Sequence, residues 1–197
     1  MQNTWTYSEP VEDLARLVGQ RLRAARRERG WSVGALAETA GIGKGSLSEV
    51  ENGARNPTLS TLYALAGALE LPLSTLLAGR PGARLTSPGV EAQLLDVRES
   101  GGATVEVYRL ALGAGAYHRS VPHGPGVVEH LLITQGRARV GRVGEEVEIG
   151  VGETAEWVSD VAHGYAAISD EPVESVLVIR SPSRAVRPDG RPSDGAI

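Results

Sequence analysis

The chain has 197 residues, of which 41% are hydrophobic and 22% are charged, and its formal net charge is −4. This length accommodates one large or two small domains, and the composition is that of a folded chain rather than a disordered one. The lack of cysteine excludes a disulfide scaffold, a zinc finger and a cysteine nucleophile. No apolar run is long enough for a membrane helix, and residues 1–10 lack the pattern of a signal peptide, so we expect a cytoplasmic protein without a membrane partner.

The charges are unevenly distributed along the chain. Residues 1–80 contain nine Lys or Arg against eight Asp or Glu and no histidine, whereas residues 81–197 contain eleven against sixteen and all four histidines. An acidic total argues against nucleic-acid binding only if the charge is uniform, because binding depends on the local patch. We therefore interpret the two halves separately.

Residues 11–78 show the apolar spacing of a compact all-α domain of five short helices. The helices are expected at residues 11–30, 33–40, 43–52, 59–69 and 73–77. The first contains six arginines against three acidic residues, a pattern that by itself is more often a solvated helix face than a DNA-binding surface. The second and third helices, joined by a turn that contains Gly41, form a helix-turn-helix pattern.

The third of these helices has two different sides. Leu47 and Val50 face inward, and the opposite side carries short polar groups and one lysine, which suit contact with the edges of bases. The outward residues are Lys44, Gly45, Ser48, Glu49 and Asn52.

An ordered set of short motifs is spread over these helices between residues 31 and 62: Leu-Ala, Gly, Leu-Ser, Glu-x-Gly, Asn-Pro and Leu. Over residues 16–78 the sequence resembles the XRE family, the Cro and phage-repressor type of DNA-binding domain. The resemblance implies that the helix at residues 43–52 enters the major groove of double-stranded DNA. The residues placed near base edges are Lys44, Gly45, Ser48 and Glu49.

The resemblance to the XRE family also implies roles for residues around this helix. Gly45 departs from the polar residue common at its position, so one base contact is lost, and Glu49 either accepts from cytosine or pairs with a neighbouring arginine. Arg26 and Glu51 match a structural ion pair of the family, which we interpret as part of the core rather than as DNA-reading. The residues expected to hold phosphates are Ser32, Asn52, Arg55 and Asn56.

Beyond residue 78 the sequence pattern changes twice. Residues 79–90 are rich in Gly and Pro and are expected to form a linker without packed structure, and residues 181–197 a disordered tail. Between them, residues 91–180 show eight short β segments, which favour a barrel or jelly roll. The strands are expected at residues 91–97, 104–112, 129–134, 137–143, 145–149, 154–158, 165–169 and 173–180. Gly136 is interpreted as a hairpin position that needs a positive φ.

A second set of ordered signals runs through the strands: Gly115, His123, Glu129, Gly136, then Gly-Val-Gly-Glu from Gly150 and His-Gly-Tyr from His163. Over residues 104–180 it resembles the cupin family, a small β barrel that often holds a divalent metal. The resemblance implies a ligand set of His123, Glu129 and His163. Pro125 stands where a second histidine of the first motif is expected, so the metal site is degenerate.

The same side chains have a second interpretation, as the polar lining of a small-molecule pocket with Tyr117 and Tyr165 at its mouth. His118 and His130 carry weaker signals, and His130 should point to the opposite face of its strand from Glu129.

Together these features predict a multidomain transcriptional regulator: a helix-turn-helix domain at residues 11–78 and a cupin-like barrel at residues 91–180. We expect a homodimer that binds a palindromic operator in double-stranded DNA, with repression favoured, and a barrel that senses a small-molecule effector, dimerises the protein, or both. One alternative is a metal-dependent dioxygenase or isomerase fused to a DNA-binding domain, against which Pro125 counts. The other is a barrel with an empty pocket that only dimerises. No catalytic residue is assigned.

Overall fold

The computed structural model describes residues 11–182, with side chains from Leu14 onward. The helices are α1 (Val11–Glu28), α2 (Val33–Thr39), α3 (Lys44–Glu51), α4 (Leu59–Ala68) and α5 (Leu73–Leu76). The strands are β1 (Arg84–Ser87), β2 (Val90–Ser100), β3 (Ala103–Leu112), β4 (Tyr117–Ser120), β5 (Val128–Gln135), β6 (Arg137–Arg142), β7 (Val147–Gly150), β8 (Thr154–Val158), β9 (His163–Ala167) and β10 (Val173–Pro182). Among the described residues, no helix combines the length and the apolar character needed to cross a membrane.

The five helices form where the sequence predicts them, and side-chain caps fix two of their starts. Ser32 Oγ accepts the backbone N–H of Ala35 at 3.0 Å and begins α2. Thr58 Oγ1 accepts the N–H of Thr61 at 3.2 Å and begins α4. Each cap satisfies one of the backbone donors that a helix start leaves without an intrahelical partner. The apolar sides of the helices meet in a shared core that includes Leu22, Leu36, Leu47, Leu62 and Leu65.

A buried ion pair ties α1 to the end of α3. Arg26 donates from Nε to Glu51 Oε1 at 2.6 Å and from Nη2 to Oε2 at 2.8 Å, and its Nη1 donates to the Trp31 carbonyl at 2.7 Å. Both side chains are buried, and the hydrogen bond to Glu51, partly offset by burial, raises the pKa of Arg26. Because every polar group of the pair is engaged, it sets the angle between α1 and α3 without leaving an unpaired charge in the core.

The strands form two antiparallel sheets that face each other as a jelly roll, the barrel-type fold that the sequence predicts. The six-stranded sheet has the order β1-β2-β3-β10-β5-β8, and the four-stranded sheet the order β4-β9-β6-β7. Alternate residues of β3 and β10 point inward, which fills the space between the sheets with side chains such as Tyr108, Leu110, Leu112 and Leu177.

Gly136 has the expected positive φ, +76°, but its predicted role in a hairpin is wrong. The strands on either side of it, β5 and β6, belong to different sheets. A Cβ at position 136 would lie 2.9 Å from the Pro172 carbonyl oxygen, so the chain changes sheets at a position where only glycine fits.

The linker expected at residues 79–90 is also wrong, because part of it is a strand. β1 pairs with β2 in register Leu85↔Ala92, and Leu85 is buried. Its Gly and Pro residues thus flank a hairpin, with Pro88 and Gly89 at the turn, rather than form a tether. Of the tail expected at residues 181–197, Ser181 and Pro182 end β10, and the others lie outside the described residues.

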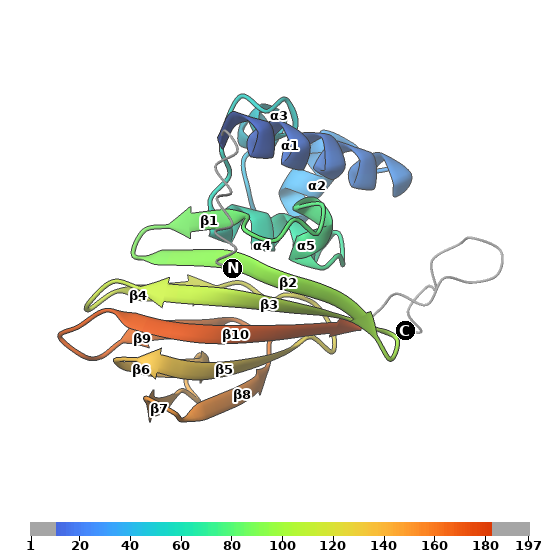
Figure 1. Cartoon of the computed structure of the whole chain (residues 1–197). Helices are drawn as coiled ribbons and strands as arrows, with labels where there is room; N and C mark the ends of the chain where they lie inside the picture. The colour runs from blue at the N-terminus through green and yellow to red at the C-terminus, as the bar shows by residue number, and fades with distance from the viewer. Residues whose placement is uncertain (1–10, 183–197) are drawn as a thin grey trace, which may run out of the picture.

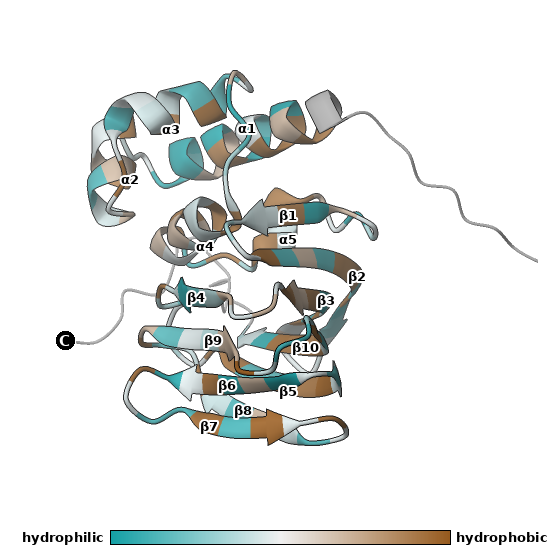
Figure 2. Cartoon of the chain, turned by 90° about the vertical axis from the view of Figure 1, so that its left-hand side faces the viewer, coloured by the Kyte–Doolittle hydropathy of each residue, from teal (hydrophilic) through white to brown (hydrophobic). Residues whose placement is uncertain are grey.

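The helices lie at one edge of the barrel, and α4 and α5 lie between α1–α3 and the sheets (Figures 1 and 2). Buried residues of the helices and of the strands form one continuous hydrophobic core. The helices α1–α5 and the barrel are therefore packed together rather than joined by a flexible linker.

The Arg26–Glu51 pair gives a first test of this packing. Glu51→Gln leaves the buried Arg26 charge without its counter-charge, so we expect the free energy of unfolding, measured by urea denaturation, to fall by about 3 kcal/mol. Glu49→Gln is the matched control, since Glu49 forms only an exposed pair with Arg55 at 3.5 Å and should change stability by about 0.5 kcal/mol or less. Equal losses in the two variants would contradict the assigned role.

Candidate functional site

All of the residues that the sequence assigns to DNA are exposed to solvent on α3, at the start of α2 or in the loop that follows α3. Leu47 and Val50 are buried, and the outward side of α3 is open to solvent. The eight assigned residues are exposed: Ser32, Lys44, Gly45, Ser48, Glu49, Asn52, Arg55 and Asn56. A Cβ added to Gly45 would meet nothing within 4 Å, so this part of α3 has free space in front of it.

Two contacts position side chains on this surface. Glu49 Oε2 lies 3.5 Å from Arg55 Nη1, and both side chains are more than half exposed, so the pair is weak and readily exchanged. Arg23 of α1 donates to Asn52 Oδ1 and also approaches Glu51 at 3.4 Å. Arg23 is a residue that the sequence analysis did not single out, although its place one turn before Arg26 on α1 was a usable signal.

Inside the barrel, His123, Glu129 and His163 come together from three separate segments. His123 follows β4, Glu129 is on β5, and His163 begins β9. Glu129 Oε1 lies 2.8 Å from His123 Nδ1 and 3.1 Å from His163 Nε2. All three are buried, and Tyr165 donates its hydroxyl to the other oxygen, Glu129 Oε2. The structure thus brings Tyr165 to the predicted trio.

The outer nitrogen of each histidine ring is held by a neighbouring group. His163 Nδ1 lies 3.0 Å from the Val161 carbonyl, which can only accept, so Nδ1 carries the proton. His123 Nε2 lies 3.0 Å from Ser120 Oγ. The inner nitrogens, His123 Nδ1 and His163 Nε2, face Glu129 Oε1 without forming an aligned hydrogen bond to any described residue. Outer-shell partners of this kind orient imidazoles for metal binding.

The electrostatics of the trio require a positive charge between its members. Burial alone would raise the pKa of Glu129, but His123 and His163 outweigh it and hold the pKa well below the usual range of a carboxyl group. Burial lowers the pKa of His123, whereas at His163 the close approach and negative charge of Glu129 overcome burial and raise the pKa. Glu129 is therefore an anion, and either a proton on His163 or a cation balances it.

The donor set fits a divalent transition metal. The three ligand atoms lie within 4.8 Å of one another and comprise two imidazole nitrogens and one carboxylate oxygen. That combination, with open positions, suits metals such as Fe(II). Pro125 offers no ligand atom where a further histidine would be expected, so the protein supplies three ligands at most from this set.

Tyr117, which the sequence placed at the mouth of the pocket, is not part of this cluster. Side chains alternate along β4, so Tyr117 points outward and is 57% exposed, while His118 and Ser120 point inward and are buried. His118, which the sequence analysis ranked low, has its ring 6.2 Å from that of Tyr165 and a buried Nε2 without a hydrogen bond in the described part of the chain. His130 faces outward as predicted, 3.2 Å from Glu156.

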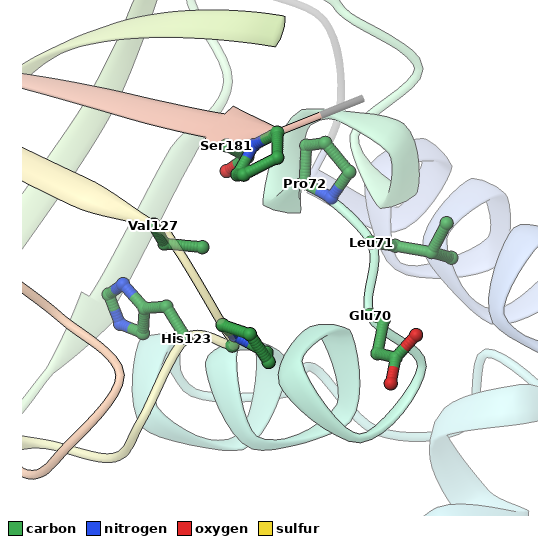
Figure 3. Close-up of a pocket in the computed structure, with 9 residues that line it drawn as sticks. Glu70, Leu71, Pro72, His123, Val127 and Ser181 are labelled. Atoms are coloured by element: carbon green, nitrogen blue, oxygen red, sulfur yellow. The ribbon is translucent and has the colours of Figure 1, made fainter. Parts of the chain in front are cut away.

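A cavity of about 180 Å³ reaches His123 from the side of the helices. Figure 3 shows Glu70, Leu71 and Pro72, from the turn between α4 and α5, on one side of it and His123 and Val127 on the other. Tyr63 of α4 stacks on the His123 ring, with centroids 4.0 Å apart and planes 9° from parallel. The cavity therefore touches one member of the trio, His123, between the helices and the barrel.

Comparisons with known proteins match both parts of the chain. A helix-turn-helix family model matches residues 22–76. The HTH-type transcriptional regulator SutR of Escherichia coli is 28% identical over 176 residues, which cover 87% of this chain and 99% of SutR. The transcriptional regulator ClgR of Mycobacterium tuberculosis is 33% identical over 46% of this chain and 80% of its own. A solved transcriptional regulator of the helix-turn-helix family from Vibrio cholerae superposes with a TM-score of 0.75 at 25% identity, covering 87% of this chain and 98% of that chain.

The converging donor atoms predict metal uptake. We expect the purified protein to bind about one Co²⁺ per chain, measured by metal analysis after removal of free ion, because a cation replaces the proton that otherwise balances Glu129. His163→Ala should abolish the uptake, and His130→Ala, which removes an exposed imidazole from the outer face, should leave it unchanged. Uptake that is absent from the unsubstituted protein, or lost equally in both variants, would contradict the assignment.

Proposed function

Because this chain belongs to the XRE family of helix-turn-helix transcriptional regulators, we propose that it represses transcription by binding a palindromic operator as a homodimer, under the control of a small molecule or ion that enters its barrel. The observation that carries the proposal is the exposed polar side of α3, which lies opposite the buried Leu47 and Val50 and carries Lys44, Ser48 and Glu49.

Each residue on that surface has a distinct role in the proposal. Lys44 donates to guanine O6 and N7 in the major groove, and Ser48 contacts a neighbouring base edge. Glu49 leaves its weak pair with Arg55 to accept from cytosine N4, which frees Arg55 for a phosphate. The N–H groups at the start of α2, capped by Ser32, and the side chains of Asn52 and Asn56 hold further phosphates.

A homodimer is supported by the outer face of the six-stranded sheet. Val176 and Val178 of β10 point outward at its centre, with Val178 beside Val107 and Val176 beside Leu132 in the strand register. A second copy related by a two-fold axis would cover this patch of valines. The resulting dimer would present two α3 helices, one from each copy, to the two halves of a palindrome.

The barrel is proposed as a sensor rather than an enzyme. Glu129, the central carboxylate, already faces two imidazoles and accepts the Tyr165 hydroxyl, and the His123 ring is covered by a side chain from the helical region. Such a site suits reversible binding that alters its neighbours. A ligand regulates DNA binding only by favouring one of two arrangements of the protein, and the contact with the helices gives it that opportunity.

Lys44→Ala tests the reading surface. Loss of a bidentate contact to guanine should weaken binding to the DNA that flanks the gene by about tenfold to a hundredfold, measured by fluorescence anisotropy at fixed salt. Arg139→Ala removes a cation from the barrel, where it pairs with Glu148 at 2.7 Å, and should bind as the unsubstituted protein does. Equal weakening by both changes, or binding that never exceeds that to unrelated DNA, would refute the assigned role.

The valine patch is tested by Val178→Glu. In the variant, the two glutamates of a two-fold dimer would be buried close together and would repel each other. Light scattering at micromolar concentration should therefore report a dimer for the unsubstituted protein and a monomer for the variant. Val151→Glu places the same charge on a residue that is 65% exposed and should leave the dimer intact. A monomeric unsubstituted protein would rule out this interface.

A further inference from the structure

Helix α4 contacts the barrel directly at the loop that carries His123. Tyr63 stacks on the His123 ring, and both side chains are buried. One turn further along the same face, Gly67 lies so close to the loop that an added Cβ would be 2.8 Å from the Pro122 carbonyl oxygen. The missing side chain at position 67 is therefore what allows α4 to approach the barrel.

The two ends of α4 are also attached to the strands. Near its start, the Ser60 backbone N–H donates to Ser87 Oγ of β1 at 3.3 Å. Beyond its end, the Ser74 N–H of α5 donates to Glu106 of β3, a buried carboxylate that also accepts the Tyr108 hydroxyl at 3.1 Å. These contacts hold α4 against the barrel along its length.

The opposite side of α4 packs into the core that it shares with α1, α2 and α3, the helices that include the surface assigned to DNA. Leu62, Leu65 and Leu69 are fully buried there. Because close-packed side chains leave little free volume, a displacement of α4 must be accommodated by the helices on which it packs.

On the barrel side, the His123 ring is fixed in three directions. Ser120 Oγ is hydrogen-bonded to Nε2 at 3.0 Å, Glu129 Oε1 lies 2.8 Å from Nδ1, and Tyr63 covers the face of the ring. The orientation of the His123 ring in the barrel is thus fixed in part by Tyr63, a side chain of the helical region. The cavity in Figure 3 opens beside this stack, so a molecule that enters it touches residues from both regions.

We propose that Tyr63 is a positioning residue that holds His123 toward Glu129, and that α4, docked on the barrel through Tyr63 and Gly67, transmits the state of the barrel site to the reading helices. The proposal rests on the proposed function as a ligand-controlled regulator. When the His123 ring is displaced, Tyr63 loses the ring on which it stacks, and α4 then moves or loosens within the helical core.

Hydrogen–deuterium exchange of the full chain tests the coupling without DNA or effector. His123→Ala should speed amide exchange in residues 59–68 about tenfold, because α4 loses its aromatic stack. His130→Ala, an imidazole removed from the outer face, should not change it. In a Tyr63→Leu background, His123→Ala should add little further, since the contact is already gone. Unchanged exchange in His123→Ala, or effects of the two changes that multiply independently, would overturn the proposal.

Gly67→Ala provides a second test that does not depend on the loss of a core side chain. Alanine favours a helix over glycine, so if α4 did not depend on its close approach to the barrel, amide exchange in α4 should slow. If the new Cβ instead pushes α4 away from Pro122, exchange should become faster and the His123 ring resonances should shift in NMR spectra. Gly34→Ala, where the new Cβ meets only Ser32 Oγ at 3.7 Å, should leave those resonances unmoved. Slower exchange or unshifted resonances in Gly67→Ala would refute the coupling.

DNA binding of the unsubstituted protein is measured separately. Loss of DNA binding with an intact His123–Tyr63 coupling would refute the proposed function alone, and DNA binding without the coupling would refute this inference alone.

Discussion

The arrangement depends on a helix that is buried on both sides. In α4, Leu62 and Leu65 face the reading helices, and Tyr63 and Gly67 face the barrel. A helix that is apolar around most of its circumference needs a packing partner on each side. This requirement brings the two regions into one continuous core, and it places the approach to His123 between them.

The second constraint is electrostatic. Glu129 is completely buried, and the described structure gives it imidazoles and a tyrosine hydroxyl but no lysine or arginine as a neighbour. A buried carboxylate of this kind needs a positive charge close by, and a proton or a metal ion can supply it. A proton and a metal ion would leave the site with different charges, and His123, the member that contacts α4, would belong to the site in either case.

Much of the helical region could be predicted from the sequence because its signals are local. The Ser32 and Thr58 caps and the apolar spacing around Leu47 and Val50 each depend on residues a few positions apart. The trio His123, Glu129 and His163 could be predicted only through the resemblance to cupins, because the residues are far apart in the sequence.

The errors arose where long-range pairing decides the outcome. β1 forms because β2 offers an edge to pair with, which no pattern in a Gly- and Pro-rich segment reveals. Tyr117 was predicted to line the pocket and His118 was ranked low because β4 was not recognised as a strand, and a strand's alternation decides which side chain points inward. The contact of Tyr63 with His123 joins residues from two regions and has no signal in either one alone.

The most direct test of the central claim is the DNA affinity of His123→Ala compared with the unsubstituted protein, measured by fluorescence anisotropy at fixed salt. His123 lies in the barrel, and the exposed side of α3 is unchanged in this variant. The account predicts a several-fold change in affinity, with no change in His130→Ala. Identical affinities in all three proteins would contradict it.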